Sequence, residues 1–227
     1  MEKNKINSIG FIADGNRRFA KKKIFNLYKG YSKGADKVIE NSIYIYNKYP
    51  EIKQISYYLL STENINRNKD EIDYLVKVFD DKFYVKDKFK NYDINIKILG
   101  NYNIIPKKLE KKLKEIENKK KNARLTVYLC IGYGGRQEII DAVNKIISKN
   151  IKKVTLENFT KYLYDKNFID PEIIVRTGNY KRLSGFLTYE CIYSELVFLK
   201  KLWPEINNKD IDKIIKNFKN IKRNFGK

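Results

Sequence analysis

Short apolar runs alternate with longer segments of helical periodicity along almost the whole chain. The runs that we expect to form strands are residues 9–13, 52–60, 94–99, 125–131 and 173–175, followed by an apolar segment at 196–198. Helices are expected directly after the first run and over residues 30–49, 71–89, 106–121, 137–148, 155–164 and 210–220. Because no repeat or linker divides the chain, this alternation predicts a single α/β domain over residues 1–227, with a mainly parallel sheet flanked by helices.

The use of cysteine and histidine narrows the possible chemistry. The chain has two cysteines, Cys130 and Cys191, far apart in the sequence, and no histidine. These counts exclude a disulfide scaffold, a zinc site built from the usual ligands and any mechanism that needs an imidazole. No uncharged apolar run approaches the ~20 residues of a membrane-spanning helix, and the N-terminus lacks a signal-peptide pattern. We therefore expect a soluble, cytoplasmic protein.

The chain carries 48 Lys and Arg against 27 Asp and Glu, a net charge of +21. Such a balance ordinarily favours a polyanionic partner, either nucleic acid or an anionic membrane. Here Lys, Asn, Ile and Tyr are abundant along the whole chain, which points to a codon bias and to diffuse, solvated charge. The aromatic residues follow strand and helix periodicity instead of alternating with arginines, so we expect no nucleic-acid partner. Peripheral contact with a membrane stays open.

Against this lysine-rich background the few arginines are informative. A planar guanidinium binds phosphate through two hydrogen bonds, which lysine cannot do. Seven of the eight arginines fall in short motif-like stretches, and only Arg124 opens an ordinary strand. They either converge on one anionic ligand or form surface ion pairs. The eight are Arg17, Arg18, Arg67, Arg124, Arg136, Arg176, Arg182 and Arg223.

Polar segments and most of these arginines follow the predicted strands, at residues 14–18, 61–67, 132–136 and 176–184. Ligands of parallel sheets bind outside the carboxyl ends of the strands, so these segments are expected to meet at one site. Asp14 suits a magnesium ligand, although an Asp-Gly turn explains it equally well. Glu195 has apolar neighbours, so it needs a metal or an arginine as its partner, or else forms a structural ion pair.

The glycines of residues 132–136 could form a backbone nest for an anion or permit a tight turn. The chain has neither a GxGxxG nor a GxxxxGK[ST] pattern, so sequence support for dinucleotide or triphosphate binding is missing. Several arginines with one magnesium site and no histidine suit a reaction driven by the departure of diphosphate.

Five blocks of the sequence resemble the cis-prenyltransferase family, whose members include proteins similar to undecaprenyl diphosphate synthase. They are FIADGNRRFA, LLSTENINR, GYGGRQEI, the stretch IVRTGNYKRLSGFLTYECIYSELVF with LWPEI, and KRNFG near the C-terminus. The resemblance implies a six-stranded parallel core, a homodimer, and the Mg²⁺-dependent addition of isopentenyl diphosphate to an allylic diphosphate in cis geometry.

The same resemblance implies roles for individual residues. Asp14 and Glu195 would hold the metal, and Asp14 and Asn64 would be catalytic, with Asn64 in the position assigned to proton removal. The allylic diphosphate site would include Gly15, Asn16, Arg17, Arg18 and Phe19. Ser61, Thr62, Glu63 and Arg67 would flank the reacting carbons. Arg176, Arg182 and Ser184 would bind isopentenyl diphosphate.

The chain departs from the family pattern at several positions. Leu27 and Tyr31 stand where an arginine and a histidine are common, Tyr180 where an acidic residue is customary, and Gly185 where an asparagine is; Asn224 begins the altered C-terminal element. Leu59 replaces a small residue of the product tunnel. Because packed cavities yield little, Leu59 predicts a short product of roughly two to four isoprene units. The alternative is that the wall is repacked around Leu59 with no effect on product length.

Two alternatives remain open. The altered allylic positions could permit irregular coupling of two allylic diphosphates, as in lavandulyl-type relatives. The chain could also be a catalytically silent partner subunit, although a scaffold has no need of Asp14, Asn64, Arg176, Arg182 and Glu195.

Overall fold

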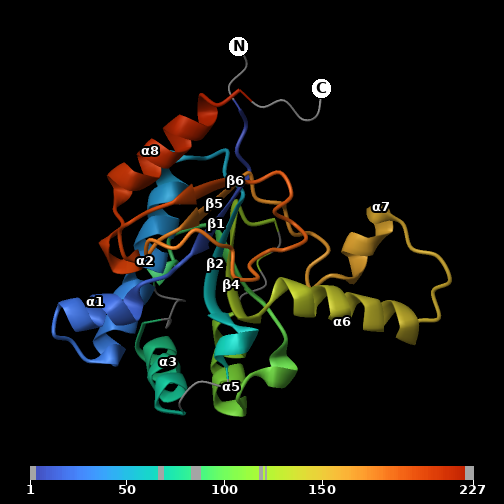
Figure 1. Ribbon diagram of the computed structural model, residues 1–227, viewed down its shortest axis with the longest axis horizontal. Coiled ribbons are helices and arrows are strands. Elements are labelled where there is room, and N and C mark those ends of the chain that lie inside the picture. Colours follow the sequence, from blue (N-terminus) through green and yellow to red (C-terminus); the bar gives the residue numbers. More distant parts are fainter. Residues whose placement is uncertain (1–3, 66–68, 83–87, 118–119, 121, 223–227) are drawn as a thin grey trace.

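A single sheet of six parallel strands forms the centre of the molecule (Figure 1). The computed structural model describes residues 4–65, 69–82, 88–117, 120 and 122–222. The strands, in the order in which they lie across the sheet, are β3 (Ile94–Leu99), β4 (Leu125–Tyr133), β2 (Gln54–Ser61), β1 (Ser8–Ile12), β5 (Ile173–Arg176) and β6 (Glu195–Phe198). The predicted α/β class and the predicted strands are confirmed, with boundaries that differ by up to two residues.

Strand β1 lies between β2 and β5 and determines where the site forms. All five of its residues are buried, as expected for a central strand covered on both faces. Phe11 pairs with Tyr57 of β2 on one side and with Val175 of β5 on the other. Because the three strands run in the same direction, the segments that follow them all leave the sheet at the carboxyl ends of the strands.

Helices connect most of the strands and cover the sheet. They are α1 (Asn16–Lys22), α2 (Leu27–Lys48), α3 (Lys69–Lys82), α5 (Lys107–Ile116), α6 (Gly135–Ser148), α7 (Leu156–Phe159) and α8 (Asn208–Lys219). Short 3₁₀ turns are η1 (Thr62–Asn64), η2 (Tyr102–Ile104), η3 (Thr160–Tyr162) and η4 (Trp203–Glu205). The helix predicted over residues 71–89 lies partly outside the described residues, and the one predicted over 155–164 is α7 followed by η3. In the described part of the chain, no helix is both long and apolar enough to cross a membrane.

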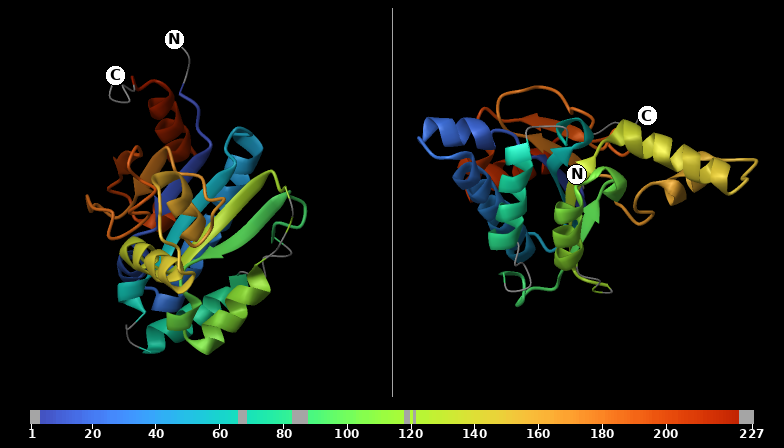
Figure 2. Two further views of the ribbon diagram at one scale, coloured as in Figure 1. Left: turned by 90° about the vertical axis from the view of Figure 1, so that its right-hand side faces the viewer. Right: turned by 90° about the horizontal axis from the view of Figure 1, so that it is seen from below.

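The two faces of the sheet bury separate apolar cores. Side chains alternate along a strand, so Phe11 and Tyr57 point into the larger core with α2, α3, α5 and α8. Tyr58 and Cys130 point into a smaller core on the other face, closed by Phe186 from the loop after β5. Helices α6 and α7 stand away from the body of the molecule (Figure 2).

Candidate functional site

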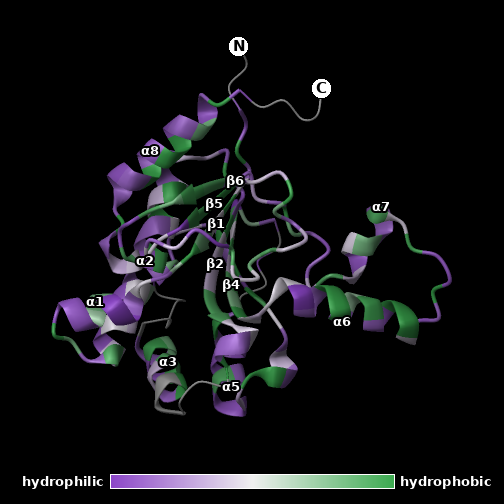
Figure 3. Cartoon of the chain, in the orientation of Figure 1, coloured by the Kyte–Doolittle hydropathy of each residue, from purple (hydrophilic) through white to green (hydrophobic). Residues whose placement is uncertain are grey.

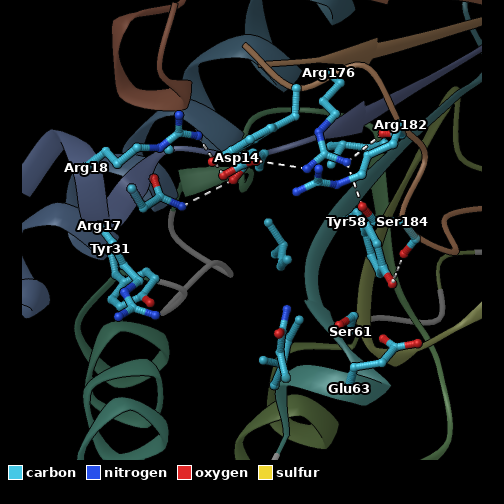
Figure 4. A pocket seen from close by; sticks show the side chains of 18 of the residues that line it. Asp14, Arg17, Arg18, Tyr31, Tyr58, Ser61, Glu63, Arg176, Arg182 and Ser184 are labelled. Atoms are coloured by element: carbon cyan, nitrogen blue, oxygen red, sulfur yellow. Dashed lines mark hydrogen bonds and ion pairs between the residues drawn. The ribbon is translucent and has the colours of Figure 1, made fainter. Parts of the chain in front are cut away.

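A cavity of about 940 Å³ opens where β1, β2 and β5 end. Most of its polar lining comes from three segments. These are residues 14–18 after β1, the end of β2 with the turn that follows it (Ser61, Glu63 and Asn64), and Arg176 with the loop that follows β5. Figure 4 shows the two halves of this lining, with Asp14, Arg176 and Arg182 on one side and Ser61 and Glu63 across the space. The prediction that the polar segments meet at one site is confirmed for these three strands.

The chain turns sharply at Gly15 to place Asp14 at the cavity. Gly15 has φ of 116°, and a Cβ there would lie 2.9 Å from Leu202, so no other residue fits without strain. The carbonyl of Asp14 accepts hydrogen bonds from the backbone N–H of Trp203 (3.0 Å) and from the hydroxyl of Thr177 (2.7 Å). The backbone of Asp14 is therefore held from two sides while its carboxylate faces the cavity.

Two arginines share the carboxylate of Asp14. The Arg176 guanidinium lies 2.9 Å from one oxygen and the Arg18 guanidinium 3.1 Å from the other. The Arg176 side chain is only 6% exposed, whereas that of Arg18 is 42% exposed. Asp14 thus partners a buried cation from β5 and an exposed cation from α1, and two segments far apart in sequence meet on one carboxylate.

Further hydrogen bonds orient both guanidinium groups. Arg176 also donates to the Ser184 hydroxyl at 2.8 Å and to the backbone carbonyl of Arg182. Arg18 donates to the carbonyl of Gly178 at 2.7 Å. A Cβ on Gly178, whose φ is 87°, would lie 2.4 Å from the Arg18 guanidinium, so a glycine is required for this approach.

Ser61, Glu63 and Asn64 form the opposite wall at the end of β2. Partial burial raises the pKa of Glu63, but hydrogen bonds from its own backbone N–H, Ser61 and Thr62 outweigh it, so the pKa lies below its usual value. Glu63 is therefore ionised near neutral pH. Asn64 lines the cavity in η1. This wall supplies a carboxylate and an amide opposite the arginines.

An apolar chamber adjoins the cavity. It is lined by Val38, Leu75, Phe79 and Trp203, among other residues, and its volume is about 40 Å³, room for no more than a few water molecules. Both spaces share Asn16, Tyr31, Leu59 and Leu60 in their linings. The site therefore joins a cationic part to an apolar part directly.

Several predicted residues lie elsewhere. Phe19 packs against Phe25, with 6.2 Å between the ring centroids, and Thr62 lies against Gly134 and outside the cavity lining. Arg67 and Asn224 fall outside the described residues. The remaining predicted substrate residues do line the cavity: Gly15, Asn16, Arg17, Arg18, Ser61, Glu63, Arg176, Arg182 and Ser184.

The structure does not bring Glu195 to Asp14 within this chain. Glu195 begins β6 and pairs with Ile173 at the start of β5, whereas Asp14 follows the end of β1. In a parallel sheet the starts and the ends of the strands lie at opposite ends of the sheet, so Glu195 and Asp14 lie at opposite ends. The role of Glu195 as a metal ligand stays a prediction.

Asp14 alone still suits Mg²⁺. The described residues contain no group of three or more Cys, Asp or Glu side chains that could hold a metal ion. Magnesium, however, binds through one or two carboxylates together with phosphate oxygens and water. The side chain of Asp14 is 29% exposed at the cavity, so its carboxylate is accessible to such an ion.

The sequence analysis missed Tyr58, and it left the glycines of residues 132–136 open. The Tyr58 hydroxyl lies 3.2 Å from the carbonyl oxygens of both Ser184 and Tyr133 and shares its one hydrogen between them, and so holds the loop after β5 over the sheet. The Gly135 N–H donates to the carbonyl of Gly185 at 2.8 Å, so it holds that loop as well. These glycines permit close packing against the site. The alternation of β2 could have indicated that Tyr58 faces the side of the sheet opposite Tyr57.

Comparison with known proteins agrees with this geometry. Residues 12–226 match the protein family described as "Putative undecaprenyl diphosphate synthase". The chain is a member of this family, the cis-prenyltransferases. This cis-prenyltransferase is 38% identical to an isoprenyl transferase of Fusobacterium nucleatum, over 100% of this chain and 98% of the relative. It is 35% identical to a tritrans,polycis-undecaprenyl-diphosphate synthase (geranylgeranyl-diphosphate specific) of Pyrobaculum aerophilum, over 96% and 95% of the two chains.

Solved structures show the same fold. The cis-prenyltransferase fold matches the crystal structure of "a probable undecaprenyl diphosphate synthase" from Campylobacter jejuni with a TM-score of 0.81 and 31% identity, over 99% of this chain and 100% of the other. It also matches lavandulyl diphosphate synthase from Lavandula x intermedia, solved with dimethylallyl diphosphate, with a TM-score of 0.85 over 98% and 99% of the two chains. At 24% identity, this second likeness supports the fold alone.

Proposed function

We propose that this protein condenses isopentenyl diphosphate with an allylic diphosphate in cis geometry and requires Mg²⁺. The observation that carries the proposal is the direct joining of an arginine-lined cavity to an apolar chamber through Asn16, Tyr31, Leu59 and Leu60. A prenyl diphosphate has the same two parts, an anionic head and an apolar chain. The family to which the chain belongs supports the same substrates.

The arginines divide into two diphosphate sites in this proposal. Arg176, Arg182 and Ser184 bind the diphosphate of isopentenyl diphosphate, while Arg17 and Arg18 bind that of the allylic substrate. Asp14 lies between the two sets, in contact with Arg18 and Arg176. Guanidinium groups held in fixed orientations stabilise the leaving diphosphate because they need not reorganise as its charge develops.

Asp14 would bind Mg²⁺ together with diphosphate oxygens. When bound there, the ion would help to neutralise the negative charge that develops on the departing diphosphate. Asp14 would then give up its contact with Arg18, the more exposed of its two arginine partners, while Arg18 would stay in place through its hydrogen bond to the carbonyl of Gly178.

Each turnover makes one carbon–carbon bond and releases one diphosphate. The allylic carbon–oxygen bond breaks with its electron pair leaving on diphosphate, and carbon 1 of the allyl group joins carbon 4 of isopentenyl diphosphate. Carbon 2 of isopentenyl diphosphate then loses a proton. Asn64 lines the cavity and would receive this proton. Because an amide is a weak base, Asn64 passes the proton on to the departing diphosphate. No histidine is needed.

Incubation of purified protein with isopentenyl diphosphate and each of a series of primers tests the proposal directly. Dimethylallyl, geranyl, farnesyl and geranylgeranyl diphosphates are compared with and without Mg²⁺, and products are identified by mass spectrometry. Product that requires both Mg²⁺ and isopentenyl diphosphate supports the proposal. Product from dimethylallyl diphosphate alone would show irregular coupling instead, and the absence of product with every primer would favour a silent subunit.

We further propose a short product of roughly two to four isoprene units, since a nearly closed chamber opposes chain growth. Leu59 lines both the cavity and the apolar chamber. The relatives named for an undecaprenyl product mark the competing outcome.

Replacing Leu59 with alanine is expected to lengthen the product by at least one isoprene unit, because the substitution opens space at the junction. Chromatography of dephosphorylated products from both proteins measures the change. Leu156→Ala, at an 83% exposed position outside the cavity, is the matched control and should leave the product unchanged. An undecaprenyl product from the unaltered protein would rule out the short-product proposal.

We also propose a homodimer in which α6 forms part of the interface. Ile140, Val143 and Ile147 follow helical spacing on α6 and are 54%, 38% and 65% exposed. Figure 3 shows hydrophobic bands, in green, along α6. An exposed apolar stripe of this kind marks an association surface.

Ile147→Asp is expected to convert the dimer to a monomer, because it places a charge within the apolar stripe that the dimer would bury. Light scattering coupled to gel filtration measures the mass of each form. Lys149→Gln, at the C-cap of the same helix, lowers the net charge by the same single unit and controls for charge alone. A monomeric unaltered protein would contradict the proposal.

A further inference from the structure

Tyr180 lies in the loop after β5, and backbone hydrogen bonds to the segment after β6 hold that loop in place. The backbone N–H of Gly178 donates to the carbonyl of Lys201 at 2.7 Å, and that of Asn179 donates to Leu199 at 3.0 Å. Asn179 has a left-handed φ of 65°, so the chain reverses immediately before the tyrosine. Tyr180 lines the cavity and is 42% exposed. An exposed aromatic ring is thus held in a defined place.

Three guanidinium groups surround this ring. The Arg182 guanidinium carbon lies 4.3 Å from the ring centroid, that of Arg18 at 4.9 Å and that of Arg176 at 5.7 Å. All three distances fall within the range of cation–π attraction. The three arginines come from α1, from β5 and from the loop after β5, so Tyr180 is a contact that they have in common.

The three arginines differ in whether a carboxylate pairs with them. Asp14 forms ion pairs with Arg18 and Arg176. Among the residues that the structure describes, no carboxylate lies within ion-pair distance of Arg182, and the contact found for its guanidinium is the ring of Tyr180. Of the three arginines around the ring, Arg182 is therefore the one that forms no ion pair with Asp14, and the ring orients it.

A ring has a different effect from a carboxylate at this position. The negative face of an aromatic ring attracts guanidinium groups without carrying a net charge. It leaves the N–H edges of the guanidinium groups available for hydrogen bonds with phosphate oxygens. A carboxylate would form hydrogen bonds with those same edges and repel a diphosphate.

We propose that Tyr180 is a positioning residue that holds Arg182 and Arg18 in the orientation that binds diphosphate, and so links the two diphosphate sites. The inference rests on the proposed function, because Arg182 belongs to the isopentenyl diphosphate site and Arg18 to the allylic site. Tyr180 acts through these arginines and does not touch the reacting carbons. Its aromatic ring carries the effect, and its hydroxyl does not.

The binding of inorganic diphosphate tests this role without any turnover. Calorimetry measures the dissociation constant of inorganic diphosphate for the full-length protein and for Tyr180→Phe and Tyr180→Leu. We expect Tyr180→Phe to match the unaltered protein and Tyr180→Leu to bind about tenfold more weakly, since several cation–π contacts are lost together. Tyr162→Leu is the matched control, because it removes a ring that lies 5.9 Å from Lys149 outside the cavity.

Kinetics with isopentenyl diphosphate then separates positioning from general damage. Tyr180→Leu should raise KM about tenfold with kcat changed less than about threefold, and Tyr180→Phe should restore KM. Equal diphosphate affinity of Tyr180→Leu and the unaltered protein would overturn the inference. Equal weakening in both variants would overturn it as well, because the hydroxyl would then be the operative group. If no primer yields product, the proposed function fails, while the calorimetric comparison still decides the role of Tyr180.

Discussion

Asp14→Asn is expected to lower kcat by about three orders of magnitude, the scale seen when one group that stabilises developing charge is removed. The amide keeps the shape of the side chain but removes the negative charge that would hold the metal ion. An amide oxygen can still accept a hydrogen bond from Arg176, now 2.9 Å from the carboxylate, so the loop should keep its conformation. Steady-state assays with saturating substrates and Mg²⁺ measure the loss.

Asp14→Ala separates the chemical role of this residue from its structural one. It should lose as much activity as Asp14→Asn and, in addition, destabilise the fold by about 1–3 kcal/mol, because a buried guanidinium loses its charged partner. Arg176 would keep its hydrogen bonds to Ser184 and to the carbonyl of Arg182, which limits the cost. Thermal unfolding of both variants measures this difference. Activity within tenfold of the unaltered protein in Asp14→Asn would refute the metal role.

Glu190→Gln is expected to stabilise the protein by about 2–4 kcal/mol at pH 8 and to remove a pH dependence of its stability. Glu190 is 5% exposed and Glu138 is 2% exposed, and the two carboxyl groups lie against each other. One oxygen of Glu190 lacks a hydrogen-bond partner among the described residues. Burial, and then the charge of Glu138, raises the pKa of Glu190 to about 8.

The direction of the pH dependence follows from that pKa. The unfolded chain releases the proton of a glutamate near pH 4.3, whereas the folded protein keeps the proton of Glu190 up to about pH 8. This contribution to stability is therefore fully present below about pH 4.3 and is lost as the pH rises to about 8. A neutral glutamine can donate to Glu138 at every pH in this range, so the slope should disappear.

Glu138→Gln provides the matched comparison for this pair. Glu138 already accepts hydrogen bonds from the Tyr133 hydroxyl and from the backbone N–H of Tyr164 at 3.0 Å. In Glu138→Gln, the side-chain NH2 would face either the Tyr133 hydroxyl or the Tyr164 N–H, and two donors cannot form a hydrogen bond. The substitution should therefore stabilise the protein less than Glu190→Gln does. Denaturant unfolding at pH 5, 6, 7 and 8 measures all three proteins. Parallel pH profiles of Glu190→Gln and the unaltered protein would contradict the raised pKa of Glu190.

Local sequence patterns were sufficient to predict the framework. Thr155 with Asn158 predicted a helix start, and both hydrogen bonds of that capping box are present. The strand of residues 9–13 followed by Asp14 predicted a polar turn at the end of a strand, and the cavity lies there. These predictions succeed because capping and alternation depend on residues only a few positions apart in the chain.

Predictions that depended on distant segments were less complete. Phe19 was assigned to the substrate site with its neighbours in FIADGNRRFA, but the rotation of α1 turns its ring toward Phe25. Thr62 follows Ser61 directly, yet the η1 turn places it against Gly134. A motif identifies a segment, while the rotation of the local helix decides which of its side chains face the cavity.

The amino-acid sequence by itself determined the α/β class, the positions of the strands and the family, because these depend on periodicity and on motifs that are continuous in the chain. Only the tertiary structure decided that Glu195 begins β6 at the end of the sheet opposite Asp14. It likewise decided that Tyr180 contacts three arginines from separate segments. It also decided that Glu138 and Glu190 share one buried site. Such pairings arise from the order of the strands and the packing of loops, and burial then makes their charges interact strongly, which no local pattern records.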